Sequence, residues 1–250
     1  MNAPSASLRQ VSPSVQSARV FPEQQMQTHT HTLPLAHKGT TPPGSPPGRE
    51  PTALTGIQDP ARNLALWRRN LDPELVAELA RLPRLAAQSA RARLAPAADW
   101  DARRRAVAAL LADHGLDALD LPAWTADLLD LLERFLRLAP DWPVKLRLEV
   151  VNDDACRRFH VDRTRLRLIC TYRGPGTEWL DDGQVDREAL MGHLPNESIL
   201  RHGHPARMEA GWVGLMKGEL FPGNQGLGLV HRSPPILDTG ETRVLFCLDG

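Results

Sequence analysis

The sequence predicts an α+β protein in which N-terminal helices pack on a jelly-roll core, that is, a double-stranded β-helix. Between about residues 59 and 142, apolar residues recur with a period near 3.6, which is typical of amphipathic helices. After Pro143 the period changes to two, and short extended segments separated by Gly, Pro and Asp clusters follow. Many short strands without helices between them are typical of a sandwich or jelly roll.

Residues 1–58 are predicted to be a disordered tail. They are rich in Pro, Ser, Thr, Gln and Gly and lack apolar periodicity. Such a segment cannot bury enough apolar surface to offset the entropy of ordering its chain. We interpret its histidines, His29, His31 and His37, as solvent-exposed residues of a biased sequence rather than as a metal site.

Three helices are predicted in the helical region 59–142. In the first, Asp72 supplies an N-cap and is followed by a proline at the first helical position. The second is expected over 99–114, and the third over 122–138. The arginines at 103–105 are expected to lie on solvated faces.

The region 143–250 is predicted to form the jelly-roll, metal-binding core. Apolar residues from Val144 to Val150 alternate with charged ones, so the first strand has one wet face. Further extended segments are expected over 158–162, 165–172, 212–217, 227–232 and 243–248. Between 186 and 207 we expect a short helix followed by a loop.

His160, Asp162 and His231 have the spacing of a metal site. His160 and Asp162 are separated by one residue on an expected strand, so both side chains leave the same face. His231 ends a later extended segment, and antiparallel folding can bring it opposite this pair. Two imidazoles and one carboxylate on one side of an octahedral metal are the ligands of non-haem Fe(II) oxygenases. We therefore predict that these three residues bind one metal ion, although a strand histidine is also often only packed or hydrogen-bonded.

The segment His231-Arg-Ser-Pro-Pro-Ile-Leu-Asp-Thr-Gly-Glu-Thr-Arg243 strengthens this interpretation. Together with the HxD at 160–162, it resembles the 2-oxoglutarate and Fe(II)-dependent dioxygenases, particularly the prolyl hydroxylase branch. That family has HxD, a distal histidine, and an arginine or lysine about one strand later. The resemblance implies that Fe(II) and 2-oxoglutarate are the cofactors.

By the same resemblance, Arg243 would hold the distal carboxylate of 2-oxoglutarate, a task for which a guanidinium is well shaped. Arg165, Arg167 and Arg232 are alternatives for that role. Tyr172, the only tyrosine, would hydrogen-bond the cosubstrate, and ordinary aromatic packing is the alternative for this side chain.

The stretch from Phe159 to Leu180, with the His-Arg-Ser-Pro-Pro ending at 231–235, also resembles an uncharacterised bacterial family, domain of unknown function 1826. This resemblance covers roughly residues 60–250. Members are similar in being encoded near metal-homeostasis GTPases of the zinc-chaperone type. The resemblance implies a link to zinc limitation and assigns no reaction.

The remaining cysteines and histidines are weaker candidates. Cys156 and Cys170 can approach the metal and favour zinc, but free cysteines are more often inert core residues. His193, His202 and His204 lie in an expected loop and are candidates for a lid or an accessory metal site.

Composition excludes several classes of protein. Basic and acidic residues both total 30, so a broad basic surface for nucleic acid is not indicated. No apolar run reaches about 18 residues, which argues against a membrane span. The chain has no CxxC pair, no GxSxG and no P-loop, which argues against a zinc ribbon, a serine hydrolase and a nucleotide-binding protein. A soluble cytoplasmic protein with reduced thiols is expected.

The leading hypothesis is an Fe(II)- and 2-oxoglutarate-dependent oxygenase-like protein that acts on an unknown small-molecule or protein substrate. One rival is a zinc-binding or metal-delivery protein that uses the same residues without turnover. A second is a cupin-like scaffold module whose triad is structural. Sites built from two histidines and one carboxylate accept both iron and zinc, so the sequence leaves the metal and the existence of turnover open.

Overall fold

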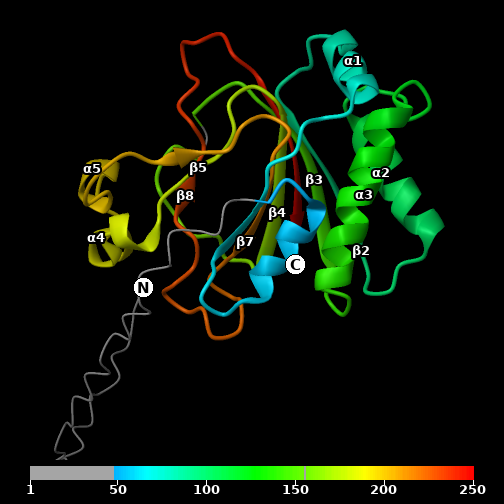
Figure 1. Ribbon diagram of the computed structural model, residues 1–250. Coiled ribbons are helices and arrows are strands. Elements are labelled where there is room, and N and C mark those ends of the chain that lie inside the picture. The colour runs from blue at the N-terminus through cyan, green and yellow to red at the C-terminus, as the bar shows by residue number, and fades with distance from the viewer. Residues whose placement is uncertain (1–47, 155) are drawn as a thin grey trace, which may run out of the picture. The chain divides into compact units, whose positions relative to one another are not determined.

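The computed structural model describes residues 48–154 and 156–250 (Figure 1). The histidines of the predicted tail and its first 47 residues lie outside the described part of the chain. The end of that tail is corrected, because residues 51–58 form the 3-10 helix η1 (Pro51–Gln58). Leu54 and Ile57 of η1 are 2% and 3% exposed and belong to the main buried cluster.

The three predicted helices are confirmed as α1 (Pro73–Arg81), α2 (Trp100–Asp113) and α3 (Pro122–Leu138). The Asp72 carboxylate caps α1 by accepting a hydrogen bond from the Glu74 amide at 2.8 Å. Helix α2 begins in the same way, at Asp99. The local capping chemistry therefore determines where these helices start.

The region 59–142 also contains two strands that the sequence pattern does not predict, β1 (Leu64–Trp67) and β2 (Gln88–Leu94). They form the two edges of a six-stranded sheet. Strand β1 is only four residues long, and β2 presents the small side chain of Ala90 to the core. Neither segment has the run of β-branched and aromatic residues that marks a strand.

The core of the structure contains two antiparallel sheets, as expected. The larger has the order β1-β7-β4-β9-β3-β2 and includes β3 (Val144–Val151), β4 (Leu166–Arg173), β7 (Val213–Lys217) and β9 (Arg243–Asp249). The smaller has the order β6-β5-β8, formed by β6 (Ala206–Arg207), β5 (Glu178–Trp179) and β8 (His231–Arg232).

Pairing between segments is nested along the chain from β3 onward. Strand β3 pairs with β9, His160 forms an isolated bridge with His231, β4 pairs with β7, and β5 pairs with β6. The first segment thus pairs with the last, and each inner pair lies within the one outside it. This nesting places the residues that follow β3 beside the residues that precede β9.

The two faces of the larger sheet have different partners. Leu148 of β3 and Phe246 of β9 belong to one buried cluster with residues of α2 and α3. Figure 1 shows these helices beside β2 and β3, away from the smaller sheet. Leu245 of β9 points to the opposite face, where it clusters with Trp179 of the smaller sheet. Alternation along each strand therefore divides the core into a helix-covered layer and an intersheet layer.

Two predicted strands are much shorter in the structure. The segment 158–162 contributes only the bridge at His160, and 227–232 contributes only β8. Between 186 and 207 the structure has two short helices rather than one, α4 (Arg187–Met191) and α5 (Asn196–Ile199); a 3-10 turn, η2 (Asp182–Gln184), precedes them. Among the described residues, no helix is long and apolar enough to cross a membrane.

Candidate metal centre

The nested pairing brings His160, Asp162 and His231 together. The backbones of His160 and His231 exchange two hydrogen bonds of 3.0 Å, and their ring centroids are 4.6 Å apart. The Asp162 carboxylate lies 3.3 Å from His231 Nε2 and 3.8 Å from His160 Nε2. One ligand atom from each residue lies within 4.8 Å of the others.

The two imidazoles are oriented by the backbone. His160 Nδ1 is 2.8 Å from the Arg158 carbonyl, and His231 Nδ1 is 3.1 Å from the Leu229 carbonyl. A carbonyl only accepts, so these contacts call for a proton on each Nδ1 and leave each Nε2 as the nitrogen that can bind a metal. Burial, together with the neighbouring His231, lowers the pKa of His160 and favours its neutral, ligand-competent form.

Asp162 supplies the negative charge of the cluster. Burial opposes ionisation, but the positive charges of His231 and His160 in their protonated forms, together with Arg167, outweigh it and hold the pKa of the Asp162 carboxyl well below its usual range. Its Oδ2 atom is 2.5 Å from Arg167 Nη1 as an ion pair, yet this buried oxygen accepts no hydrogen bond of good geometry.

These groups fit a divalent cation. One nitrogen of each imidazole and a carboxylate oxygen converge, and with neutral imidazoles all three are acceptors. Such an arrangement is repulsive unless a cation or a proton lies among them. Two histidines and one carboxylate are suitable ligands for Fe(II) and for Zn(II).

Arg243 is a buried arginine at the start of β9, with 1% of its surface exposed. It donates to the Pro175 carbonyl at 2.7 Å, to Ser233 Oγ at 3.0 Å and to Thr177 Oγ1 at 3.4 Å. No carboxylate among the described residues forms an ion pair with it, and burial lowers the pKa of its guanidinium. Ser233 follows His231 by two residues, so one arm of Arg243 contacts a residue about 7 Å along the chain from His231.

The three alternative arginines for the cosubstrate have different partners. Arg165 lies 5.0 Å over the ring of Trp142 as an exposed cation–π pair. Arg232 donates to Glu178 at 2.8 Å, and Arg167 pairs with Asp162. Arg243 alone among the four is buried without an acidic or aromatic partner in the described part of the chain.

Tyr172 is not at this site, which corrects its predicted contact with the cosubstrate. Its hydroxyl donates to Asp127 Oδ2 of α3 at 2.6 Å, and its ring packs edge-on against Trp124. Alternation along β4 places Tyr172 with Leu168 and Cys170 on the helix-covered face, opposite Arg167.

The remaining cysteine and histidine candidates also lie away from the cluster. Cys170 is buried on the helix-covered face, where burial raises the pKa of its thiol to about 11. His202 and His204 are exposed, and their backbone carbonyls accept hydrogen bonds from Gln184. Within residues 48–154 and 156–250, the group of His160, Asp162 and His231 is the only cluster suited to a metal.

A cavity of about 290 Å³ lies beside His160, whose side chain is 35% exposed. Its walls come from the segment that ends at the bridge, from α4 and α5, and from the turn between these helices: Cys156, Arg158, Phe159, His160, Leu190, His193 and Ile199. Cys156 and His193 thus lie near the cluster but outside it. The cavity wall is mainly apolar, with basic groups and a thiol added.

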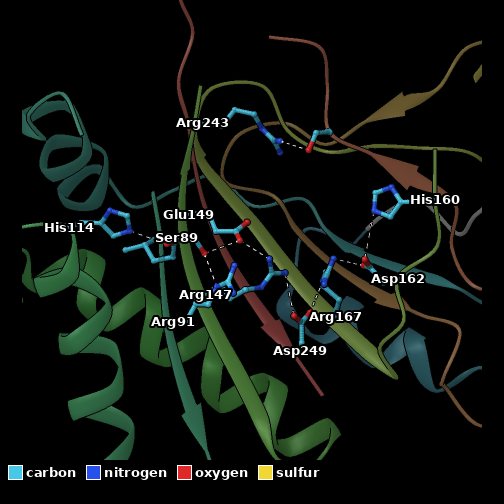
Figure 2. Close-up of polar contacts among 12 residues, drawn as sticks. Ser89, Arg91, His114, Arg147, Glu149, His160, Asp162, Arg167, Arg243 and Asp249 are labelled. Carbon is cyan, nitrogen blue, oxygen red and sulfur yellow. Dashed lines mark hydrogen bonds and ion pairs between the residues drawn. The ribbon is translucent and has the colours of Figure 1, made fainter. Parts of the chain in front are cut away.

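Two polar residues near the cluster have roles that the sequence does not predict. Arg167 is expected from the sequence only as an alternative for the cosubstrate, but it contacts Asp162, and Asp249 in turn contacts Arg167 at 2.6 Å. Figure 2 shows these three side chains in one row of contacts. One signal in the sequence could have pointed to Arg167: it is a charged residue within the mostly apolar strand β4, on the face that turns toward Asp162.

Comparisons with known proteins place the chain in a family and give distant structural neighbours. A rice dioxygenase for auxin oxidation is 15% identical, with a TM-score of 0.48, covering 78% of this chain and 76% of that one. A Pseudomonas putida prolyl-4-hydroxylase is 11% identical, with a TM-score of 0.40, covering 79% and 96%. The Arabidopsis thaliana auxin dioxygenase 1 in its 2-oxoglutarate complex is 12% identical, with a TM-score of 0.38, covering 70% and 75%.

TM-scores below 0.5 at such identities carry no weight for function. No curated protein matches the sequence significantly. The family model described as "Protein of unknown function (DUF1826)" matches residues 48–249, which is most of the sequence. The chain therefore belongs to the DUF1826 family.

Proposed function

We propose that this protein is an Fe(II)- and 2-oxoglutarate-dependent oxygenase built on a double-stranded β-helix. The nested antiparallel pairing of β3 with β9, of His160 with His231, of β4 with β7 and of β5 with β6 supports that architecture. His160, Asp162 and His231 would hold the metal from one side. A bound ferrous ion would activate dioxygen for oxidation of the cosubstrate and hydroxylation of a substrate.

The buried Arg243 is the observation that carries the proposal. A guanidinium held in a dry interior without a carboxylate is costly unless a ligand supplies the anion. Arg243 donates one arm to Ser233, two residues after the proposed ligand His231. In our proposal, one carboxylate of 2-oxoglutarate would bind the metal and the other would bind this guanidinium, which would fix one end of the cosubstrate.

The cavity beside His160 is the proposed position of the substrate. It borders a proposed metal ligand, and its apolar wall at Phe159, Leu190 and Ile199 can exclude water from a bound group. Leu190 of α4 and Ile199 of α5 would thus help to set which substrate fits.

Calorimetry under nitrogen on single variants tests the proposal. His160→Ala, Asp162→Ala and His231→Ala should each abolish tight binding of Fe(II) or Mn(II), because each removes one of three ligands. Arg243→Met should keep the metal and lose affinity for 2-oxoglutarate. His202→Ala is the matched control, since this exposed histidine lies outside the cluster.

Two results would contradict the proposal. If all the triad variants bind metal like the wild-type protein, the triad is structural. If the triad variants lose metal but the wild-type protein never binds 2-oxoglutarate, zinc handling without turnover is the function, and a metal-homeostasis GTPase becomes the partner to test.

A further inference from the structure

We infer that Arg167, held in place by Asp249, is a positioning residue that fixes the Asp162 carboxylate for metal binding. This inference rests on the proposed metal site and adds two residues to it. Both lie on central strands of the larger sheet, Arg167 on β4 and Asp249 on β9.

The Asp162 side chain needs an external anchor. Asp162 lies outside any strand, between the bridge at His160 and the start of β4. Its backbone is fixed, because its carbonyl accepts a hydrogen bond from the Glu219 amide at 2.8 Å. Outside the triad, Arg167 is the only described residue in ion-pair contact with its carboxylate, at 2.5 Å. The direction of the carboxylate therefore depends on Arg167.

Arg167 is itself immobilised. Its Nε donates to Asp249 Oδ1 at 2.6 Å, and the two residues are direct partners across the β4–β9 ladder. The second oxygen of Asp249 lies 3.3 Å from Arg147 Nη2, and Arg147 Nη1 donates to Glu149 at 2.7 Å. Figure 2 shows this row of alternating charges running along the sheet to Asp162. Because both oxygens of Asp249 have an arginine partner, the guanidinium of Arg167 is held with Nη1 at ion-pair distance from Asp162.

Two alternative roles for Arg167 predict different results. If the row of charges only stabilises the sheet, loss of Arg167 lowers the melting temperature and leaves metal affinity unchanged. If the Arg167 charge mainly repels a metal ion, its loss makes metal binding tighter. A positioning role predicts weaker metal binding, because the groups that orient metal ligands typically contribute about 10- to 100-fold in affinity.

The test measures the Kd of Mn(II) by calorimetry on full-length variants, together with the melting temperature in a chelator. Arg167→Met should weaken binding about 10- to 100-fold. Arg167→Lys should recover only part of this loss, because a single ammonium cannot serve Asp162 and Asp249 as a fork does. Asp249→Asn should also weaken binding, and it should add nothing in the Arg167→Met background, because Asp249 acts through Arg167.

Arg69→Met is the matched control. Arg69 forms a similarly buried pair with Asp127, at 2.5 Å, on the helix-covered side of the sheet. This variant should melt at a lower temperature and bind Mn(II) with the wild-type Kd. A control result of weaker binding would mean that general destabilisation, not positioning, lowers the affinity.

Failure of the inference is distinguishable from failure of the proposed site. If His231→Ala abolishes binding but the Arg167 and Asp249 variants bind Mn(II) as tightly as the wild type or tighter, Arg167 does not position Asp162. If Arg167→Met does not fold, Arg167→Lys and Asp249→Asn decide by the same criterion. If His231→Ala binds like the wild type, the metal site itself is wrong and the positioning role falls with it.

Discussion

Replacing Arg243 with methionine separates a ligand-binding arginine from a structural one. Methionine is similar to arginine in length, but it lacks the positive charge and the hydrogen-bond donors of the guanidinium. Hydrogen bonds to charged groups contribute about 1.5–3 kcal/mol each, and truncating one partner of a buried charge pair costs about 2–5 kcal/mol. A loss of about 3 kcal/mol corresponds to roughly 100-fold weaker binding of 2-oxoglutarate.

The same substitution should change the free energy of unfolding of the ligand-free protein very little. Arg243→Met loses three hydrogen bonds from a charged guanidinium to neutral oxygens, each worth about 1.5–3 kcal/mol. It also removes a buried charge that no carboxylate among the described residues balances, and this relief is of the same order. The net change expected is under about 1 kcal/mol. Arg69→Met, which strands the buried Asp127 carboxylate, should by contrast cost about 3 kcal/mol.

Urea unfolding of metal-free protein gives the stabilities, and calorimetry on Mn(II)-loaded protein gives the Kd of 2-oxoglutarate. The reasoning fails if Arg243→Met retains wild-type affinity. It also fails if this variant is destabilised as much as Arg69→Met, because Arg243 would then be a structural side chain.

Three further predictions address the rest of the molecule. Deletion of residues 1–47 should leave the melting temperature unchanged, whereas deletion of 1–58 removes two buried side chains of η1 and should cost about 3–6 kcal/mol in the urea assay. Leu190→Trp should fill the cavity beside the triad and reduce turnover of a substrate, once one is found, without changing the Kd of metal or 2-oxoglutarate. At pH 8, iodoacetamide should alkylate the exposed Cys156 and spare Cys247 in native protein by mass spectrometry, because burial raises the pKa of Cys247 to about 12 and keeps it a neutral thiol.

Features set by local chemistry were predictable from the sequence. The starts of α1 and α2 follow from the capping side chains of Asp72 and Asp99. The period-two pattern of β3 follows from one wet and one covered face. The gathering of His160, Asp162 and His231 was also predictable, because their spacing suits an antiparallel fold.

Features set by tertiary contacts were not predictable. Strand β2 has alternating alanine and arginine, and its strand conformation depends on pairing with β3. The prediction for Tyr172 is wrong because Tyr172 and Leu168 lie on the face of β4 that helix α3 covers, and the sequence alone does not show which face that is. The role of Asp249 is hidden in the sequence because its partner, Arg167, lies 82 residues away and meets it only across the β4–β9 ladder.

The most direct test of the proposed function is the metal dependence of 2-oxoglutarate binding. Calorimetric titration of 2-oxoglutarate into Mn(II)-loaded and metal-free protein compares the two states of the same chain. Arg243 contacts Ser233, two residues after His231, and in our proposal the metal and Arg243 hold the same cosubstrate. We therefore predict saturable binding with metal and at least about 10-fold weaker binding without it. Equal binding in the two states, or no binding in the metal-loaded state, would contradict the proposal.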